Sequence, residues 1–165
     1  MKSNLRSMYI SKIKELSVLF LCLLMLFSCP ITALASENET TEVDVEYFDD
    51  GSYLVTETTF DNTLTRASTK SATRRLTYFN ANDVSEWYFE LSATFSYTGS
   101  SVTCTRADVA TKIYNDQWKV KDTSSSKSGG KATGTIEIKY TVMGVTIKTV
   151  TKTLILTCSR DGTII

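Results

Sequence analysis

The sequence predicts an all-β protein: an antiparallel β-sandwich of immunoglobulin-like architecture, with one disulfide, after an N-terminal signal peptide. Apolar and polar residues alternate with period two along several segments, most clearly over 87–96 and 132–142. Thr, a β-branched residue that suits strands even where it faces water, is abundant. No segment after residue 35 gives a convincing amphipathic helix. Short strands with frequent turns, seven to nine in all, are typical of a sandwich or barrel.

The first element is a secretory signal peptide over 1–35. Its basic start precedes the apolar run Leu16–Phe27, and Ala33–Ala35 supplies the small-x-small cleavage motif, with cleavage after Ala35. An uncleaved transmembrane anchor is disfavoured because a spanning helix needs roughly 20 apolar residues. Lipoprotein processing at Leu26–Cys29 fits its motif poorly. We therefore expect a secreted protein, extracellular or associated with the cell wall, with no stable membrane span after cleavage.

Cleavage also changes the charge balance. The full chain has 18 basic and 18 acidic residues and no His. Removing four cations and one acid leaves 14 basic and 17 acidic residues, a net charge of −3. Residues 36–65 contain nine acids and no cation, and the remainder is net +6. This balance argues against a nucleic-acid binder held by bulk positive charge.

The acidic part, 36–72, is expected to form a hairpin and a polar linker ahead of a β-sandwich domain over 73–165. Val43–Phe48 and Tyr53–Thr58 are strand-like and flank Asp49–Ser52, whose Gly is typical of a hairpin turn. Asp61–Ser71 is polar and is interpreted as a linker or long exposed loop.

The first strands of the main domain are predicted from the same alternation. The segment from Trp87 to Phe95 could instead begin a helix capped by Asp83, but the alternation continues through Phe95, where a helical stripe would fail. Thr123–Lys131 is expected to be a loop because it is rich in Ser, Gly and Lys. The expected strands are 73–80, 87–96, one around 102–104, 109–114 and 117–122.

The last two strands form a second hairpin, with Met143-Gly144 as its turn. A two-residue turn places Tyr140 opposite Ile147, so that odd-numbered residues of the return strand face inward. The later apolar residues Leu154 and Leu156 are even-numbered. Since a one-residue slip turns every side chain to the other face, we expect a β-bulge or sheet crossing between residues 149 and 153.

Two cysteines remain after cleavage, Cys104 and Cys158. In an exported domain one such pair is expected to form a disulfide. Closing a loop of this length stabilises by roughly 4 kcal/mol in the chain-entropy model. By analogy with immunoglobulin domains the bond is expected beside Trp87 or Trp118. A metal-binding pair is disfavoured because the cysteines are far apart and no His is present.

Catalytic chemistry has little support, and we expect no enzyme activity, cofactor or bound metal. The absence of His removes the commonest general base. Asp49–Ser52 could bind Ca²⁺, but Asp-Gly is also an ordinary turn. Glu86 and Glu90, two strand steps apart on one face, could form a glycosidase pair, but solvent-facing acids on a strand are far commoner.

Exposed aromatic residues are the remaining indication of function. Tyr88 faces outward if Trp87 faces inward, so it is the candidate surface-binding residue for an extracellular protein or polysaccharide. The alternative is a membrane-active or antagonistic, pore-forming protein that uses the hairpin 133–157. Lys139 and Lys148, expected opposite each other on the outer face, disfavour that alternative.

Five short segments carry a resemblance to known proteins: 65–71 (TRASTKS), 78–80 (YFN), 93–101 (ATFSYTGSS), 118–120 (WKV) and 156–162 (LTCSRDG). With these segments the chain resembles a group of small secreted proteins of Gram-positive, clostridia-like bacteria. The resemblance implies export and a β domain, and it implies no activity.

Overall fold

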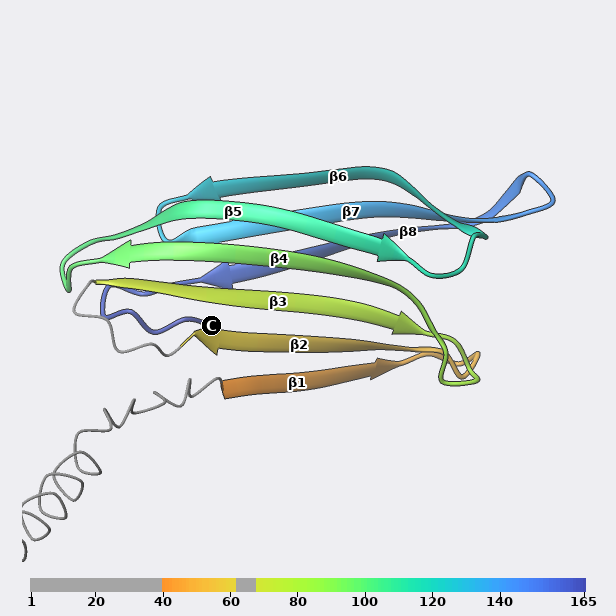
Figure 1. The fold of residues 1–165 in the computed structure, drawn as a ribbon, viewed down its shortest axis with the longest axis horizontal. Helices are drawn as coiled ribbons and strands as arrows, with labels where there is room; N and C mark the ends of the chain where they lie inside the picture. The colour runs from red at the N-terminus through yellow and green to blue at the C-terminus, as the bar shows by residue number, and fades with distance from the viewer. Residues whose placement is uncertain (1–39, 62–67) are drawn as a thin grey trace, which may run out of the picture. The chain divides into compact units, whose positions relative to one another are not determined.

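The computed structural model describes residues 40–61 and 68–165, which form eight antiparallel strands (Figure 1). These strands belong to one compact unit, Glu37–Ile165. The predicted signal peptide and its cleavage site at Ala35 lie outside the described residues. Within the described part of the chain, no helix is long and apolar enough to cross a membrane.

The strands form two antiparallel sheets, as predicted. Each strand pairs with its neighbour in sequence, so each sheet is a meander, and the connections differ from the Greek key of immunoglobulin domains. Sheet A contains β1 (Thr40–Tyr47), β2 (Tyr53–Asp61), β3 (Thr69–Phe79), β4 (Ser85–Tyr97) and β5 (Val102–Ile113). Sheet B contains β6 (Trp118–Ser128), β7 (Lys131–Val142) and β8 (Val145–Thr157).

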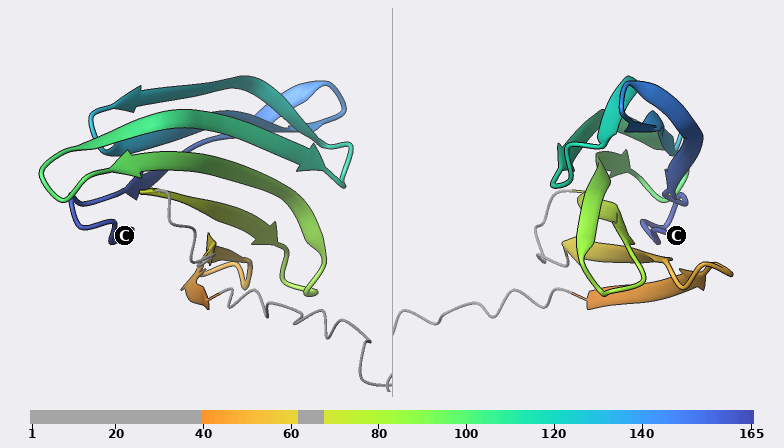
Figure 2. Two further views of the ribbon diagram at one scale, coloured as in Figure 1. Left: turned by 60° about the vertical axis from the view of Figure 1, so that its left-hand side comes forward. Right: turned by 90° about the vertical axis from the view of Figure 1, so that its right-hand side faces the viewer.

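The core lies between the facing surfaces of the two sheets (Figure 2). The predicted alternation in β4 is confirmed, because Trp87, Phe89, Leu91 and Phe95 are almost completely buried. Burying one such side chain contributes about 1.5–3 kcal/mol relative to leaving it exposed. From sheet B the core receives Ala132, Ile136, Ile138, Leu154 and Leu156.

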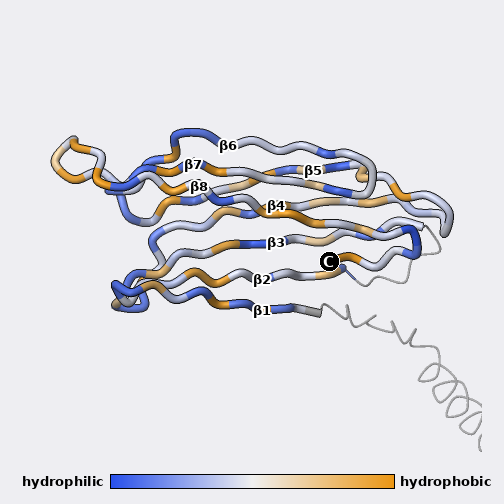
Figure 3. Tube along the Cα trace, turned by 180° about the vertical axis from the view of Figure 1, so that it is seen from behind, coloured by the Kyte–Doolittle hydropathy of each residue, from blue (hydrophilic) through white to orange (hydrophobic). Residues whose placement is uncertain are grey.

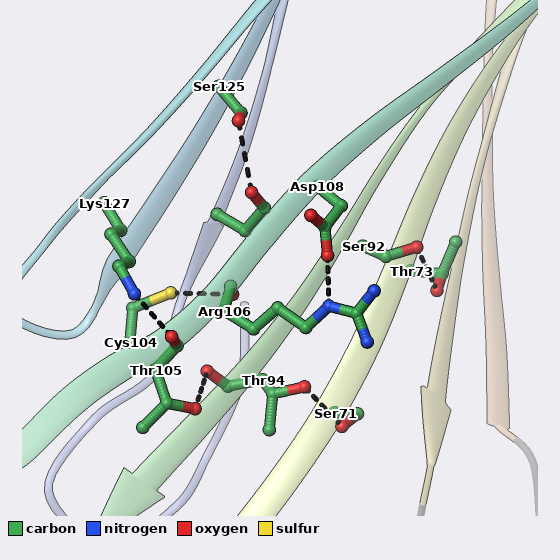
Figure 4. A network of polar contacts seen from close by, with 11 residues as sticks. Ser71, Thr73, Ser92, Thr94, Cys104, Thr105, Arg106, Asp108, Ser125 and Lys127 are labelled. Carbon is green, nitrogen blue, oxygen red and sulfur yellow. Dashed lines mark hydrogen bonds and ion pairs between the residues drawn. The ribbon is translucent and has the colours of Figure 1, made fainter.

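Side-chain hydrogen bonds join the two sheets where β5 passes β6 (Figure 4). Ser125 Oγ donates to the carbonyl of Ala107 at 3.1 Å, and Lys127 Nζ donates to the carbonyl of Thr105. The loop expected over 123–131 is therefore wrong: the Ser-rich run continues β6 and pairs with β7. Its polarity reflects exposure on both faces of an edge strand, which lies beside β5.

A β-bulge in the second hairpin is present, but it lies nearer the turn than predicted. Tyr140 pairs with Lys148 while Thr141 pairs with Thr146, so Ile147 is the extra residue. The bulge places the even-numbered residues of β8 on the inner face beyond it, as the apolar pattern requires. The predicted pairs Tyr140–Ile147 and Lys139–Lys148 are both wrong for this reason, since Lys139 pairs with Thr149.

The acidic hairpin forms as predicted, and it extends sheet A because β2 pairs with β3. Gly51 occupies its turn at φ 80°, and Asp50 Oδ1 accepts the backbone N–H of Ser52 at 3.0 Å. Asp49–Ser52 is thus a turn, and the described residues contain no group of Asp, Glu or Cys able to hold a metal ion. Residues 69–71 of the expected linker belong to β3, and 62–67 lie outside the described residues.

The disulfide expected between Cys104 and Cys158 is not formed, and both are buried free thiols. The segment Gly129-Gly130 runs between them: Cys104 N donates to the carbonyl of Gly129, and Cys158 N to that of Gly130 at 2.8 Å. Each thiol donates instead to a carbonyl close by in sequence. Cys104 Sγ donates to the carbonyl of Arg106 at 3.1 Å, and Cys158 Sγ donates to that of Ser159 at 3.4 Å.

The expected position of the cysteines beside a Trp is also wrong. Cys104 pairs across the sheet with Phe95, whereas Trp87 pairs with Ile113 near the other end of the same two strands. Phe95 lies eight positions along β4 from Trp87, a span of about 26 Å at the usual rise of a strand.

Candidate functional site

A pocket of about 560 Å³ opens at the end of the molecule where the β1–β2, β3–β4, β5–β6 and β7–β8 turns gather (Figure 1). Its volume falls in the range of small-ligand sites, about 300–1,000 Å³. It combines aromatic walls with several polar side chains from both sheets. The lining residues are Asp50, Tyr78, Asn80, Glu86, Asn115, Gln117, Trp118, Tyr140, Ile147 and Lys148.

Glu86 enters this pocket because of a bulge at the start of β4. Phe79 pairs with Ser85 and Tyr78 pairs with Trp87, which leaves Glu86 as the extra residue. Glu86 and Trp87 are therefore both buried although they are consecutive. Glu90 stays on the outer face of sheet A and forms a 2.6 Å ion pair with Arg75. The grouping of Glu86 with Glu90 on one face, considered from the sequence, is wrong.

The Glu86 carboxylate is the polar centre of the pocket. It accepts a hydrogen bond from Asn80 Nδ2 at 2.6 Å, another from Asn115 Nδ2, and a third from Trp118 Nε1 at 3.1 Å. Burying a carboxylate is costly unless hydrogen bonds replace its hydration. These three donors provide that replacement, and in return Glu86 fixes the position of two amides and one indole.

The oxygen atoms of the two amides are also engaged. Asn80 Oδ1 accepts the backbone N–H groups of Asn82 and Val84 at 2.9 and 3.2 Å, and Asn115 Oδ1 accepts that of Gln117 at 3.0 Å. An amide nitrogen carries two hydrogens, and each of these gives one to Glu86. The second hydrogen of each amide is therefore a pre-positioned donor for a ligand.

Aromatic rings form the walls. The buried Trp118 ring lies 5.4 Å from the Tyr78 ring and 5.0 Å from the Tyr140 ring, both in tilted or edge-on geometry. Tyr78 in turn stacks on Trp87 at 5.6 Å. The Tyr140 hydroxyl donates to Gln117 Oε1 at 2.8 Å, which fixes that ring beside the amides. Tyr78 and Tyr140 are half-buried, so parts of both rings remain available for contact.

The rim carries one charge of each sign. Hydrogen bonds from the hydroxyl and the backbone N–H of Ser52 lower the pKa of Asp50, and the nearby positive charge of Lys148 lowers it further. Both side chains are exposed. The two rim charges balance each other, and the Glu86 carboxylate inside the pocket is held by its three hydrogen-bond donors.

Tyr88, the surface residue predicted from the sequence, lies elsewhere. It is half-buried on the outer face of sheet A, with the Arg75 guanidinium 4.7 Å from its ring and the Tyr114 ring 6.2 Å away. The alternation of apolar residues could have placed Trp118 and Tyr140 on inner faces. Nothing in the sequence marks the bulge that brings Glu86 between them.

Comparison with known proteins gives no family model that matches the chain, and no curated protein or solved structure matches it either.

Proposed function

We propose that the chain is an exported, non-enzymatic domain that binds a polysaccharide at the pocket between Tyr78 and Tyr140. The observation that supports this most is the arrangement of aromatic rings beside amide donors that Glu86 holds in place. In this proposal the principal contact residue is Tyr140, and not Tyr88 as expected from the sequence.

The chemistry of the pocket suits a sugar. A pyranose ring has an apolar C–H face and a rim of hydroxyl groups, so it needs flat apolar walls and fixed hydrogen-bonding groups together. Tyr78 and Tyr140 provide the walls, and Asn80, Asn115 and Gln117 lie beside them. Because hydrogen bonds within the protein hold these groups before a ligand arrives, little ordering remains to oppose binding.

The non-enzymatic part of the proposal is supported by the placement of the carboxylates. A glycosidase pair must lie on either side of one bond. Glu86 is buried among donors in the pocket, and Glu90 is paired with Arg75 on the opposite face of the sheet. These two acids therefore do not form such a pair.

Export is supported by residues 1–35, with their basic start, apolar run and Ala33–Ala35 motif. Expression of the full chain in a Gram-positive host is expected to release a protein that begins at Ser36. N-terminal sequencing and intact mass of the released protein test this. A protein that keeps residues 1–35, or carries lipid on Cys29, would contradict simple secretion.

Binding is tested by retention of residues 36–165 on purified cell walls and on a panel of polysaccharides. Tyr140→Ala should abolish retention, and Tyr140→Phe, which keeps the ring, should preserve most of it. Tyr88→Ala is the matched control on the outer face and should bind normally. No retention of the unmodified protein would overturn the proposal, and loss of binding only in Tyr88→Ala would place the site on the outer face instead.

A further inference from the structure

The tip of the β7–β8 hairpin exposes a continuous group of apolar side chains. Met143 is 100% exposed, Val145 61% and Ile147 63%. Val142 pairs with Val145 directly below the turn, so the apolar side chains adjoin one another. Figure 1 shows this tip extending past the neighbouring turns, and Figure 3 shows its hydrophobic colouring.

Met143 is unfavourable for folding in two ways. Its φ is 48°, in the left-handed region, and that of Gly144 is 81°. Two-residue turns of this kind prefer Asn, Asp or Gly at the first position. Met143 is therefore strained as well as completely exposed to water. Neither property helps the isolated protein to fold, which points to an apolar environment that receives this side chain.

Lysines lie behind the tip. Lys139 of β7 pairs directly opposite Lys119 of β6, and like charges opposite each other in a sheet are destabilising. Neither forms one of the ion pairs found within the described residues. Lys148 lies on β8 opposite Tyr140. An anionic surface beside the hairpin would relieve the repulsion between Lys119 and Lys139.

The spacing of the two groups matches a membrane interface. Lys139 precedes Val142 by three residues, a distance of about 10 Å along a strand. Interfacial segments bury their apolar side about 5–10 Å into the boundary between headgroups and acyl chains. Apolar residues at the tip would then reach the acyl boundary while the lysines meet the headgroups. A projecting tip also suits a deformable lipid layer better than a preformed protein groove.

We propose that the β7–β8 tip anchors the domain reversibly to a lipid bilayer with anionic headgroups. Met143, Val145 and Ile147 insert, and Lys119 and Lys139 bind the headgroups. This attachment is peripheral and forms no pore. Ile147 also lines the pocket, so the attachment and the pocket share this side chain.

The test is flotation of residues 36–165, which contain the whole compact unit, with vesicles of phosphatidylcholine alone or mixed with phosphatidylglycerol. We expect binding to the anionic vesicles only, weakened by salt. Met143→Asn should lower partitioning about tenfold or more, because it removes one buried apolar side chain. Lys119→Gln and Lys139→Gln should each lower it about fivefold.

Met143→Asn also distinguishes a loss of membrane binding from a loss of folding. Asn tolerates a positive φ, so Met143→Asn should have an unchanged or higher Tm. Val43→Thr, which removes an exposed apolar residue of 60% exposure from β1, is the matched control and should bind normally.

Three results would overturn the proposal. One is the absence of binding to anionic vesicles, and another is normal binding by Met143→Asn. The third is release of trapped dye at binding concentrations, which would indicate a pore. If the tip instead joins two copies of the chain, sedimentation will show a dimer that Met143→Asn dissociates, and vesicles will not bind.

Discussion

Trp118 Nε1 donates a 3.1 Å hydrogen bond to Oε2 of the buried Glu86, whereas the indole nitrogen of the adjacent Trp87 has no partner within the described residues. The two indole rings lie 5.9 Å apart at 65°. Two Trp residues in one cluster thus have different roles: Trp118 links the carboxylate to sheet B, and Trp87 fills the core.

This difference can be measured with double-mutant cycles. Trp118→Phe and Glu86→Ala should show a coupling energy of about 1.5–3 kcal/mol, the usual value of a hydrogen bond to a charged group. Trp87→Phe and Glu86→Ala should show coupling within about 0.5 kcal/mol of zero. Urea unfolding of the single and double variants supplies the free energies. Equal coupling for both Trp residues would contradict the assignment.

Much of the fold could be predicted from period-two patterns. The inner face of β4 and the two hairpins follow from them because each strand has one face against the core. The extent of β6 could not, because Ser125 and its neighbours are exposed on both faces and have no alternation to detect. Strand pairing with β7, rather than burial, makes this segment a strand.

The candidate site was harder to predict than the fold because it depends on bulges. A single extra residue at Glu86 moves a carboxylate from the surface into the pocket, and another at Ile147 brings Lys148 opposite Tyr140. The apolar pattern of β8 indicates that a bulge is needed in the second hairpin, although not where it lies, whereas no pattern marks the bulge at Glu86. The sequence therefore pointed to one exposed aromatic residue, Tyr88, and gave no sign of the pocket around Glu86.

Gly130 packs closely against the carbonyl of Cys158 and the side chain of Val102. A Cβ added there would lie 2.4 Å from the carbonyl oxygen of Cys158 and 2.7 Å from Val102 Cγ1. The carbonyl cannot move freely, because the N–H of the same residue donates to Gly130. Gly130→Ala should therefore lower the free energy of unfolding by about 3 kcal/mol, the upper end of the usual cost of overpacking.

Gly134→Ala is the control for this substitution. Its added Cβ would meet only side chains, the nearest being Val109 Cγ1 at 2.8 Å, and side chains can adjust. Its cost should be smaller, about 1–2 kcal/mol. Chemical denaturation of both variants tests the order, and a larger loss for Gly134→Ala would show that the backbone at Gly130 can yield.

Asp161 makes the C-terminal turn sensitive to acid. Hydrogen bonds from the Ser159 hydroxyl and from the Thr163 N–H lower the pKa of Asp161 to about 2, from its ordinary 3.8. Because the folded chain binds this proton less tightly than the unfolded chain, the contribution to stability is present above about pH 4. It is lost as the pH falls from there through about 2.

Asp161→Asn should remove this part of the acid sensitivity. Between about pH 5 and pH 2 the Tm of the unmodified protein should fall further than that of the variant. The pKa itself can be measured from the carboxyl chemical shift. A midpoint at the ordinary value of 3.8 would show that the hydrogen bonds to Ser159 and Thr163 do not persist in solution.

The free thiols of the reduced protein should be protected from alkylation. Burial raises the pKa of both Cys104 and Cys158, so the reactive thiolate is scarce as well as covered. Iodoacetamide near pH 8 should leave the folded reduced protein unmodified and add two groups in denaturant, as read by intact mass. Labelling of one cysteine in the folded state would show that its side of the Gly129-Gly130 segment opens.

Because unfolding lets both thiols ionise at their ordinary pKa of 9.0, the stability of the reduced protein should also fall above about pH 9. A variant with Ala at both positions should lack that decline.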